Sequence, residues 1–281
     1  IPGAAKGHGL TFRESIGVCA AITPWNFPML IASWKVAPAL AMGNTVVIKP
    51  ASATPLTALL MADCALEAGL PPGVLNVVSG PGGAAGNALV GDPRVRKISF
   101  TGSTEIGAGI MRLAAGDIKR VSLELGGKSA NIIFADADLS VCVESSLGSV
   151  FDNAGQDCCA RSRFLIQRAI YDEFVEKFVA RVKAMKVGDP LDPATEMGPL
   201  ITPQHRQSVC GYLEIGDSEA KRVTGGEMPT DGPLAKGNYL TPAVYVDVSS
   251  GMRIAQEEIF GPVVVLIPFD TEEEAVRIAN D

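Results

Sequence analysis

The sequence predicts an α/β protein in which a parallel sheet lies between layers of helices. Short, near-continuous apolar segments alternate with longer segments of helical periodicity, and Gly or Pro residues separate them. Such apolar strands are typical of parallel sheets that helices cover on both faces. The composition agrees, because 47% of the 281 residues are hydrophobic and 20% are charged.

The first half of the chain contains four strand–helix pairs. "NTVVIKP" is an apolar strand stopped by Pro50, and the helix after it has Pro55 near its start and Gly69 at its end. In the first helix, Pro38 is expected either to kink the helix or to mark its start. The pairs comprise strands at 16–22, 44–50, 73–80 and 96–103, and helices at 29–43, 55–69, 87–91 and 104–116.

The pattern changes after Gly126 and Gly127. A strand at 129–138, a long helix at 139–155, a strand at 163–167 and an amphipathic helix at 169–185 follow. The Pro- and Gly-rich stretch 187–203 is expected to be an ordered surface loop, and "AVYVDVS" and "VVVLIPF" are late strands. We therefore predict two linked α/β lobes. The first spans 1–123 and contains a parallel, Rossmann-like sheet, and the second spans 124–281.

Composition narrows the classes of partner. The net charge of −7 and pI of about 5.0 argue against nucleic acid. No apolar stretch reaches the roughly 20 uncharged residues of a membrane helix. "IPGAAKGHGL" lacks the layout of a signal peptide, and the six cysteines are not regularly spaced. These features favour a cytoplasmic protein that binds neither membrane nor nucleic acid.

We also expect no dedicated metal site. His8 and His205 are interpreted as surface residues, and no CxxC or HExxH motif occurs.

Several loops carry residue types that suit chemistry, although each has a structural alternative. In "SFTGSTEIG", backbone amides at the start of a helix would hold a phosphate, or Ser103 or Thr104 would simply cap that helix. Lys49, at the end of a strand, would bind a ribose or phosphate, or would snorkel at the rim of the sheet. Asn26, between two prolines, would be an oxyanion donor or part of a packed turn.

Two acidic segments also allow both a functional and a structural interpretation. Glu124, among leucines, would be a general base or an exposed strand residue. In "QEEIFGPVV", Glu257 or Glu258 would bind sugar hydroxyls while Phe260 packs on a ring, or both acids would be solvated at a helix end.

The cysteines fall into two groups. Cys158 and Cys159 lie between a helix and a strand. Because adjacent side chains point in different directions, at most one of the two thiols is expected to face a given site. The remaining cysteines fit small buried hydrophobes, and they are Cys19, Cys64, Cys142 and Cys210.

Six segments, taken in their order, resemble the aldehyde dehydrogenase superfamily over nearly the whole chain. They are "TPWNFP", "VVIKPAS", "FTGSTEIG", "LELGGKSA", "GQDCCARSR" and "EEIFGPV". The resemblance implies that an aldehyde is oxidised to a carboxylate through a covalent thioester, with NAD or NADP as cofactor. It also implies a homodimer or homotetramer for the full-length protein.

The resemblance implies roles for four catalytic residues. Cys158, two residues after the glutamine of "GQ", corresponds to the family nucleophile, and Glu124 to its general base. Asn26 corresponds to the oxyanion donor. Lys35, in "SWKVAP", stands at a position that the family links to proton movement.

Other positions are implied to contact the cofactor or the substrate. Ser52 stands where many NAD-preferring members carry a glutamate, so it does not repel the 2′-phosphate of NADP. The cofactor residues are Trp25, Lys49, Ser52, Gly102, Ser103, Glu258 and Phe260. The substrate pocket comprises Phe27, Ile31, Trp34, Phe151, Asp152 and Cys159, and the acid among them suggests tolerance for cationic aminoaldehydes.

Two rival functions remain at this stage. A coenzyme A-acylating dehydrogenase would share most motifs, but that branch typically lacks the base that corresponds to Glu124. The chain is also shorter than a family subunit, and "IPGAAKG" and "RIAND" do not look like natural ends. An inactive nucleotide-binding remnant is therefore the second alternative.

Overall fold

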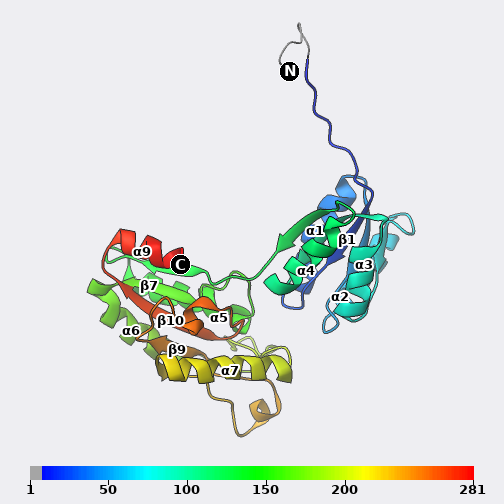
Figure 1. Ribbon diagram of the computed structural model, residues 1–281. Coiled ribbons are helices and arrows are strands. Elements are labelled where there is room, and N and C mark those ends of the chain that lie inside the picture. Colours follow the sequence, from blue (N-terminus) through cyan, green and yellow to red (C-terminus); the bar gives the residue numbers. More distant parts are fainter. Residues whose placement is uncertain (1–7) are drawn as a thin grey trace. The chain divides into compact units, whose positions relative to one another are not determined.

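A computed structural model describes residues 8–281, which divide into two compact units between Leu125 and Gly126 (Figure 1). The segment "IPGAAKG", interpreted above as an unnatural end, lies outside the described residues. The boundary between the units falls after Leu125, whereas the sequence placed it after residue 123. Glu124 therefore belongs to the first unit.

The first unit is built on a five-stranded sheet in which every pairing is parallel, as the sequence predicted. Its strand order is β3-β2-β1-β4-β5, so the order reverses between β1 and β4. The strands are β1 (Val18–Ile22), β2 (Thr45–Lys49), β3 (Leu75–Val77), β4 (Val95–Thr101) and β5 (Arg120–Glu124).

Helices cover both faces of this sheet because successive strand residues point to opposite sides. In β1, Cys19 and Ala21 pack under α1 and α2, whereas Ala20 and Ile22 pack against α3 and α4. The helices are α1 (Pro28–Ala41), α2 (Leu56–Glu67), α3 (Asn87–Gly91) and α4 (Thr104–Ala115), and a π-helical turn, η1 (Gly82–Gly86), precedes α3.

The second unit contains a second five-stranded sheet of order β6-β7-β10-β9-β8. Only the edge pair β8–β9 is antiparallel among the pairings of the described residues. The strands are β6 (Ala130–Ile133), β7 (Arg163–Gln167), β8 (Lys221–Thr224), β9 (Ala243–Val246) and β10 (Val263–Phe269).

One hydrophobic core holds this unit together, and aromatic rings dominate it. Phe164 of β7 packs edge-to-face against Phe174 and Phe178 of α6, with ring centroids 6.1 and 5.2 Å apart. The helical elements are α5 (Leu139–Phe151), η2 (Asp152–Gly155), α6 (Arg168–Lys183), α7 (Pro203–Glu219), η3 (Pro233–Lys236), α8 (Arg253–Gln256) and α9 (Glu272–Ala279).

Several sequence interpretations need correction. The helix predicted at 139–155 ends at Phe151, and α7 was not foreseen. Of the two alternatives for Pro38, the start of the helix is excluded, because Pro38 lies inside α1. Cys64 is exposed, not buried, because it lies on the solvent side of α2. His205 is half-buried rather than a surface residue.

The stretch 187–203 is a loop as predicted, and an isolated bridge joins Val187 to Met197 within it. Among residues 8–281, no helix combines the length and apolar character that spanning a membrane requires.

Candidate functional site

The carboxyl edge of the first sheet gathers most of the residues predicted to bind the cofactor. In open parallel sheets, ligands bind at this edge, where the strand order reverses, because neighbouring loops diverge and leave a crevice. The reversal lies between β1 and β4. Trp25 and Asn26 follow β1, Lys49 ends β2, Gly102 and Ser103 follow β4, and Glu124 ends β5.

Lys49 is buried, although the sequence favoured a lysine that snorkels to solvent. Its ammonium donates a hydrogen bond to the carbonyl oxygen of Pro50 at 2.8 Å, and burial lowers its pKa. Ser52 lies near it in the chain and is exposed, and its hydroxyl donates to the carbonyl oxygen of Gly80 at 3.1 Å.

The turn after β4 matches the capping interpretation of "SFTGSTEIG". Ser103 is the N-cap of α4, and its hydroxyl oxygen accepts from the N–H of Ile106 at 3.4 Å. Gly102 is required because a Cβ there would overlap the ring of Phe100. A phosphate-binding role for this helix start stays a prediction, and it is compatible with the cap.

Unsatisfied hydroxyl groups mark the same edge. Among the described residues, the hydroxyls of Thr23, Thr54 and Thr101 are buried without a hydrogen-bond partner. Thr23 follows β1, Thr54 lies between β2 and α2, and Thr101 ends β4. Buried polar groups normally find a partner, so this edge suits a polar ligand.

Asn26 and Trp25 are half-buried in the short loop between β1 and α1. Hydrogen bonds hold both ends of this loop. The N–H of Thr23 donates to the Lys49 carbonyl at 3.1 Å, and the N–H of Ile31 donates to the Phe27 carbonyl at 3.0 Å. The loop is thus a rigid mount for the Asn26 amide.

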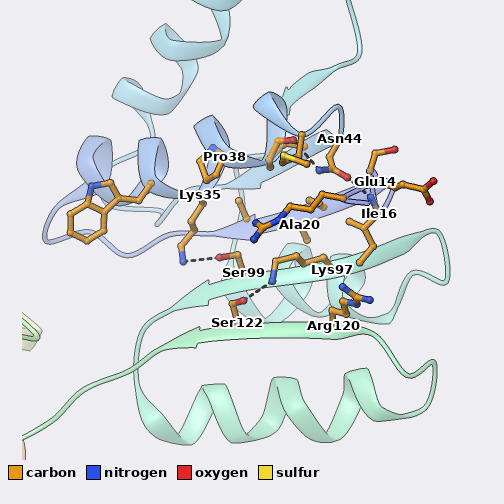
Figure 2. A pocket seen from close by; sticks show the side chains of 18 of the residues that line it. Glu14, Ile16, Ala20, Lys35, Pro38, Asn44, Lys97, Ser99, Arg120 and Ser122 are labelled. Carbon is orange, nitrogen blue, oxygen red and sulfur yellow. Dashed lines mark hydrogen bonds between the residues drawn. The ribbon is translucent and has the colours of Figure 1, made fainter. Parts of the chain in front are cut away.

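Lys35 projects from α1 toward the polar side of β4 and β5 (Figure 2). Its ammonium donates to the Ser99 hydroxyl at 3.1 Å. Burial lowers the pKa of Lys35 to about 8, the negative charge of Glu124 opposes that shift, and the charge of Lys97 adds to it. Glu124 itself is exposed at the end of β5.

An open cavity of about 870 Å³ lies beside Lys35 (Figure 2). Its walls include the basic side chains of Lys35, Lys97 and Arg120, together with Trp34 and the hydroxyls of Ser99 and Ser122. Trp34 and Lys35 are the two predicted site residues in this wall, and the wall reaches the amino-terminal ends of the strands. We therefore place the site at the carboxyl edge and not in this cavity.

In the second unit, a strained turn follows α5 and leads to the twin cysteines. Asn153 and Ala154 have φ of 51° and 57°, a left-handed conformation that costs free energy for residues with a Cβ. Gly155 continues the turn with φ of 70°. A side chain there would overlap the carbonyl of Gly261, which precedes β10.

Gln156 anchors the next part of the loop. Its side chain is buried, its amide NH₂ donates to the Asn153 carbonyl at 2.8 Å, and its amide oxygen accepts from the N–H of Ile201 at 2.9 Å. In the sequence Gln156 served only as a family marker, so this positioning role was missed.

Cys158 and Cys159 lie beyond this anchor, with their sulfur atoms 3.8 Å apart. The two side chains therefore converge, whereas the sequence predicted adjacent side chains that point in different directions. Cys158 is half-buried and Cys159 is exposed. Burial, followed by the hydrogen bond with Cys159 and the charge of Asp157, raises the pKa of the Cys158 thiol to about 12. Within its own unit the Cys158 thiol is therefore held in its protonated form.

The two glutamates before β10 have different surroundings. Glu257 accepts from the Arg253 guanidinium at 2.7 Å and from the Tyr212 hydroxyl at 2.9 Å. Glu258 lies against Gly126, where a Cβ would overlap its carboxylate, and accepts from the N–H of Gly127 at 3.4 Å. Burial raises the pKa of Glu258.

Phe260 stands in a left-handed conformation with φ of 56°, which is rare for a bulky residue. Its carbonyl oxygen lies 2.7 Å from Nε2 of His205, whose ring is half-buried under the loop. The contact holds the chain at the start of β10, and it was not foreseen because His205 was interpreted as a surface residue.

Two predicted pocket residues are buried. Phe151 is completely buried and stacks on Phe178 with ring centroids 6.2 Å apart, and Ile31 is buried on α1. Their place in the substrate pocket stays a prediction. Phe27 is half-buried, whereas the other predicted pocket residues are exposed, namely Trp34, Asp152 and Cys159.

Arg163, which had no role in the sequence, has a structural one. Its guanidinium donates to the carbonyl oxygens of Lys128, Ile278 and Ala279 at 2.7, 3.0 and 3.1 Å. It thus ties β7 to the end of α9.

The predicted site is therefore divided between the units. The first holds Asn26, Lys35 and Glu124 with the cofactor residues before residue 125, and the second holds Cys158, Cys159, Glu258 and Phe260.

Comparison with known proteins adds a family. The family model described as "Aldehyde dehydrogenase family" matches residues 1–281. The chain is 50% identical over 270 residues to betaine aldehyde dehydrogenase of Bacillus subtilis (strain 168), covering 96% of this chain and 55% of that protein. It is 50% identical over 274 residues to the mitochondrial aldehyde dehydrogenase of Homo sapiens, covering 96% and 52%.

A solved structure of an aldehyde dehydrogenase has the same fold as this chain. Betaine aldehyde dehydrogenase from Staphylococcus aureus, in complex with NAD+, superposes with a TM-score of 0.93 at 43% identity, covering 95% of this chain and 53% of that one. The α/β fold predicted from the sequence is confirmed. The chain spans about half the length of the curated relatives that it matches.

Proposed function

The chain belongs to the aldehyde dehydrogenase family, and from this premise we propose that the protein that carries it oxidises an aldehyde to a carboxylate with NAD+ or NADP+. The observation that supports this most directly is the thiol of Cys158, which the buried Gln156 and the strained turn hold outside the core. A thiol fixed on such a loop suits a nucleophile that must meet a carbonyl carbon in one orientation.

The proposed reaction uses one thiol, one amide and one carboxylate. The Cys158 thiol passes its proton to solvent, its sulfur attacks the aldehyde carbon, and the amide of Asn26 donates a hydrogen bond to the oxyanion that forms. NAD+ or NADP+, when bound, accepts the hydride. Glu124 then takes a proton from water, which attacks the thioester and releases the carboxylate and the thiol.

The first unit offers groups that fit a dinucleotide. Exposed and buried polar groups follow three strands of the carboxyl edge, among them the unsatisfied hydroxyls of Thr23, Thr54 and Thr101. Lys49 would bind the adenosine ribose, and the start of α4 at Ser103 would face the pyrophosphate. In the second unit, Glu258 would hold the nicotinamide ribose beside Phe260.

The preference between the two cofactors is proposed from Ser52. Its exposed hydroxyl carries no charge, so nothing at this position repels a 2′-phosphate. We expect both cofactors to be used. In Ser52→Glu, the ratio of kcat/KM for NADP+ to that for NAD+ should fall at least about tenfold, the scale of one unfavourable charge contact. An unchanged ratio would mean that the 2′-phosphate of NADP+ does not bind next to residue 52.

The substrate class is proposed as medium-sized aldehydes, including cationic ones. Asp152 is exposed and follows α5 directly, so its charge would favour an ammonium group at the pocket mouth. Steady-state rates with betaine aldehyde and with a neutral aldehyde of similar size test this. Asp152→Asn should raise KM for the cationic substrate alone, and an equal change for both would refute the electrostatic role.

The nucleophile is tested by two matched variants of the complete polypeptide. Cys158→Ser should lower kcat at least about 1,000-fold, the scale on which removing a nucleophile acts. Cys159→Ser should change KM more than kcat. Loss of turnover in Cys159→Ser alone would reverse the assignment.

The first rival, acyl transfer to coenzyme A, is distinguished from hydrolysis by the product that forms. With coenzyme A present we expect free carboxylate, and a thioester product would contradict the hydrolytic proposal. Glu124→Gln should give a single burst of reduced cofactor and then stall, because the acyl group stays on Cys158.

A further inference from the structure

Three side chains that bind metals are adjacent on the loop after the strained turn. Asp157, Cys158 and Cys159 each offer one ligand atom, and these atoms all lie within 4.8 Å of one another. The two sulfur atoms are 3.8 Å apart. This cluster is the one group of three or more such side chains found within residues 8–281.

The spacing of the sulfur atoms matches a tetrahedral metal. Two sulfur atoms that each lie about 2.3 Å from one zinc ion are about 3.8 Å apart when the site is tetrahedral. The rotamers therefore already place Cys158 and Cys159 at the edge of such a tetrahedron. Because the Asp157 oxygen lies no more than 4.8 Å from either sulfur atom, it would need to approach by at most roughly 1 Å to reach the usual zinc–oxygen distance of about 2.1 Å.

The loop that carries the cluster is fixed on both sides. Asp157 Oδ1 accepts from the backbone N–H of Cys159 at 2.9 Å, and the N–H of Ala160 donates to the Asp157 carbonyl at 3.1 Å. The N–H of Arg161 donates to the Ser149 carbonyl at 2.9 Å. Little ordering is left for a metal to impose, which favours binding.

Access and charge also suit a cation. Cys159 is exposed, and Cys158 and Asp157 are half-buried, so an ion reaches all three from solvent. A carboxylate beside two thiols disfavours a thiolate but favours a dication, since the metal deprotonates the thiols that it binds. Two thiolates select soft or borderline ions such as Zn²⁺ over Mg²⁺ or Ca²⁺.

We propose that Asp157, Cys158 and Cys159 form a site for one soft divalent cation, represented by Zn²⁺, with water completing the tetrahedron. Binding replaces the two thiol protons, which pass to solvent, by two sulfur–zinc bonds. The sequence predicted no dedicated metal site because it contains neither CxxC nor HExxH, and adjacent cysteines fall outside both patterns.

The consequence for activity rests on the proposed function. A zinc ion on the Cys158 sulfur occupies the electron pair that would attack the aldehyde. The site is thus an inhibitory one, in which Zn²⁺ reversibly withdraws the proposed nucleophile and a chelator restores it.

Metal binding is tested first, without reference to catalysis. Co²⁺ is added to the reduced full chain, with a phosphine as reductant, and the sulfur-to-cobalt charge-transfer band is followed. Zn²⁺ then displaces the Co²⁺. We expect one cobalt per chain, loss of the band in Cys158→Ser and in Cys159→Ser, and affinity at least about tenfold lower in Asp157→Asn.

The matched control is Cys64→Ser, which removes an exposed thiol from α2 in the first unit and should leave the band intact. The proposal is overturned if both serine variants at 158 and 159 bind cobalt as the unchanged chain does. It is also overturned if Cys64→Ser abolishes the band.

Inhibition is tested second, with each variant's metal-free rate as its reference. In Cys159→Ser, at least about tenfold more Zn²⁺ should be needed for half-inhibition of aldehyde oxidation. A cobalt band without any aldehyde oxidation would refute the proposed function and leave the metal site standing. Aldehyde oxidation without a cobalt band would refute the metal site and leave the proposed function standing.

Discussion

The Glu258 carboxylate lies against the backbone of Gly126. It occupies the space that the Cβ of any other residue at position 126 would need. The two residues are 132 positions apart in the sequence. This contact brings "GGK" and "EEIFG" together within the second unit and explains the glycine at position 126. Gly126 leaves room for the acid, whereas a Cβ on Gly127 would meet no atom, and Gly127 contributes its backbone N–H to the acid at 3.4 Å.

Gly126→Ala should therefore weaken cofactor binding while leaving the fold almost as stable. The added methyl meets only the flexible end of Glu258, which swings away at small cost and leaves the proposed ribose contact. We expect the dissociation constant for NAD+ to rise about tenfold, as one lost hydrogen bond predicts. Calorimetric titration and the unfolding midpoint measure both quantities. A large fall in stability with unchanged cofactor affinity would refute this.

Gly155→Ala provides the contrast, because its neighbour cannot move. The new Cβ would overlap the backbone carbonyl of Gly261, and the residue has φ of 70°. Strain and overlap together should lower the free energy of unfolding by more than about 2 kcal/mol. Urea denaturation followed by far-ultraviolet circular dichroism measures it. A loss below 0.5 kcal/mol (roughly the scale of an ordinary surface change) would show that the turn relaxes.

The sequence predicted strands better than it predicted helix ends. Strand β10 (Val263–Phe269) and strand β7 (Arg163–Gln167) coincide with their predicted ranges, because apolar runs between breakers are a local signal. The end of α5 is not a local matter. "DNAG" has no obligatory breaker before Gly155, and its left-handed turn exists because Gly155 packs against Gly261, far along the chain.

The helix α7 was missed for a related reason. Its buried residues Val209, Leu213 and Gly216 keep a helical spacing, but polar residues surround them, and the apolar stripe is narrow.

For the candidate site as well, the sequence predicted some features and missed others. Motifs suggested which residues to name, including Cys158, Glu124 and Asn26, and those roles stay predictions. What motifs could not supply is packing. Phe151 is a core residue, and Gln156 is an anchor, because both facts depend on contacts between segments distant in the sequence.

Lys128→Met should stabilise the protein below neutral pH. Among the described residues, the Lys128 ammonium is buried without a hydrogen-bond partner, and burial together with the charge of Arg163 lowers its pKa to about 7. An unfolded lysine has a pKa of about 10.4, so the unfolded chain binds more protons. The free energy of unfolding should therefore rise as the pH increases from about 7 to about 10.

In Lys128→Met that rise should disappear, with a gain on the order of 1–3 kcal/mol at pH 6, taken as the cost of an unpaired buried charge. Lys128→Arg is the matched control, since it keeps the charge and cannot lose its proton. It should be less stable than the parent at high pH. A methionine variant that is less stable at pH 6 would mean that attraction to Glu257 and Glu258 outweighs burial.

Ser99→Ala should lower the pKa of Lys35 still further. The hydroxyl of Ser99 accepts a hydrogen bond from Lys35 at 3.1 Å, and an ammonium gains more from such an acceptor than a neutral amine does. Burial has already brought this pKa to about 8, so the unfolding free energy should rise with pH from about 8 to about 10. In Ser99→Ala the rise should begin at lower pH.

Both tryptophans of the chain, Trp25 and Trp34, lie in the first unit, so their fluorescence during urea unfolding reports on this unit alone. Ser122→Ala is the matched control. The Ser122 hydroxyl, on β5, accepts a hydrogen bond from the Lys97 ammonium at 2.5 Å. Removing it leaves the hydrogen bond between Lys35 and Ser99 in place. Ser99→Thr keeps a hydroxyl and should restore the parent profile. If Ser99→Ala and Ser122→Ala shift the profile equally, the effect comes from the polar face as a whole and not from the hydrogen bond to Lys35.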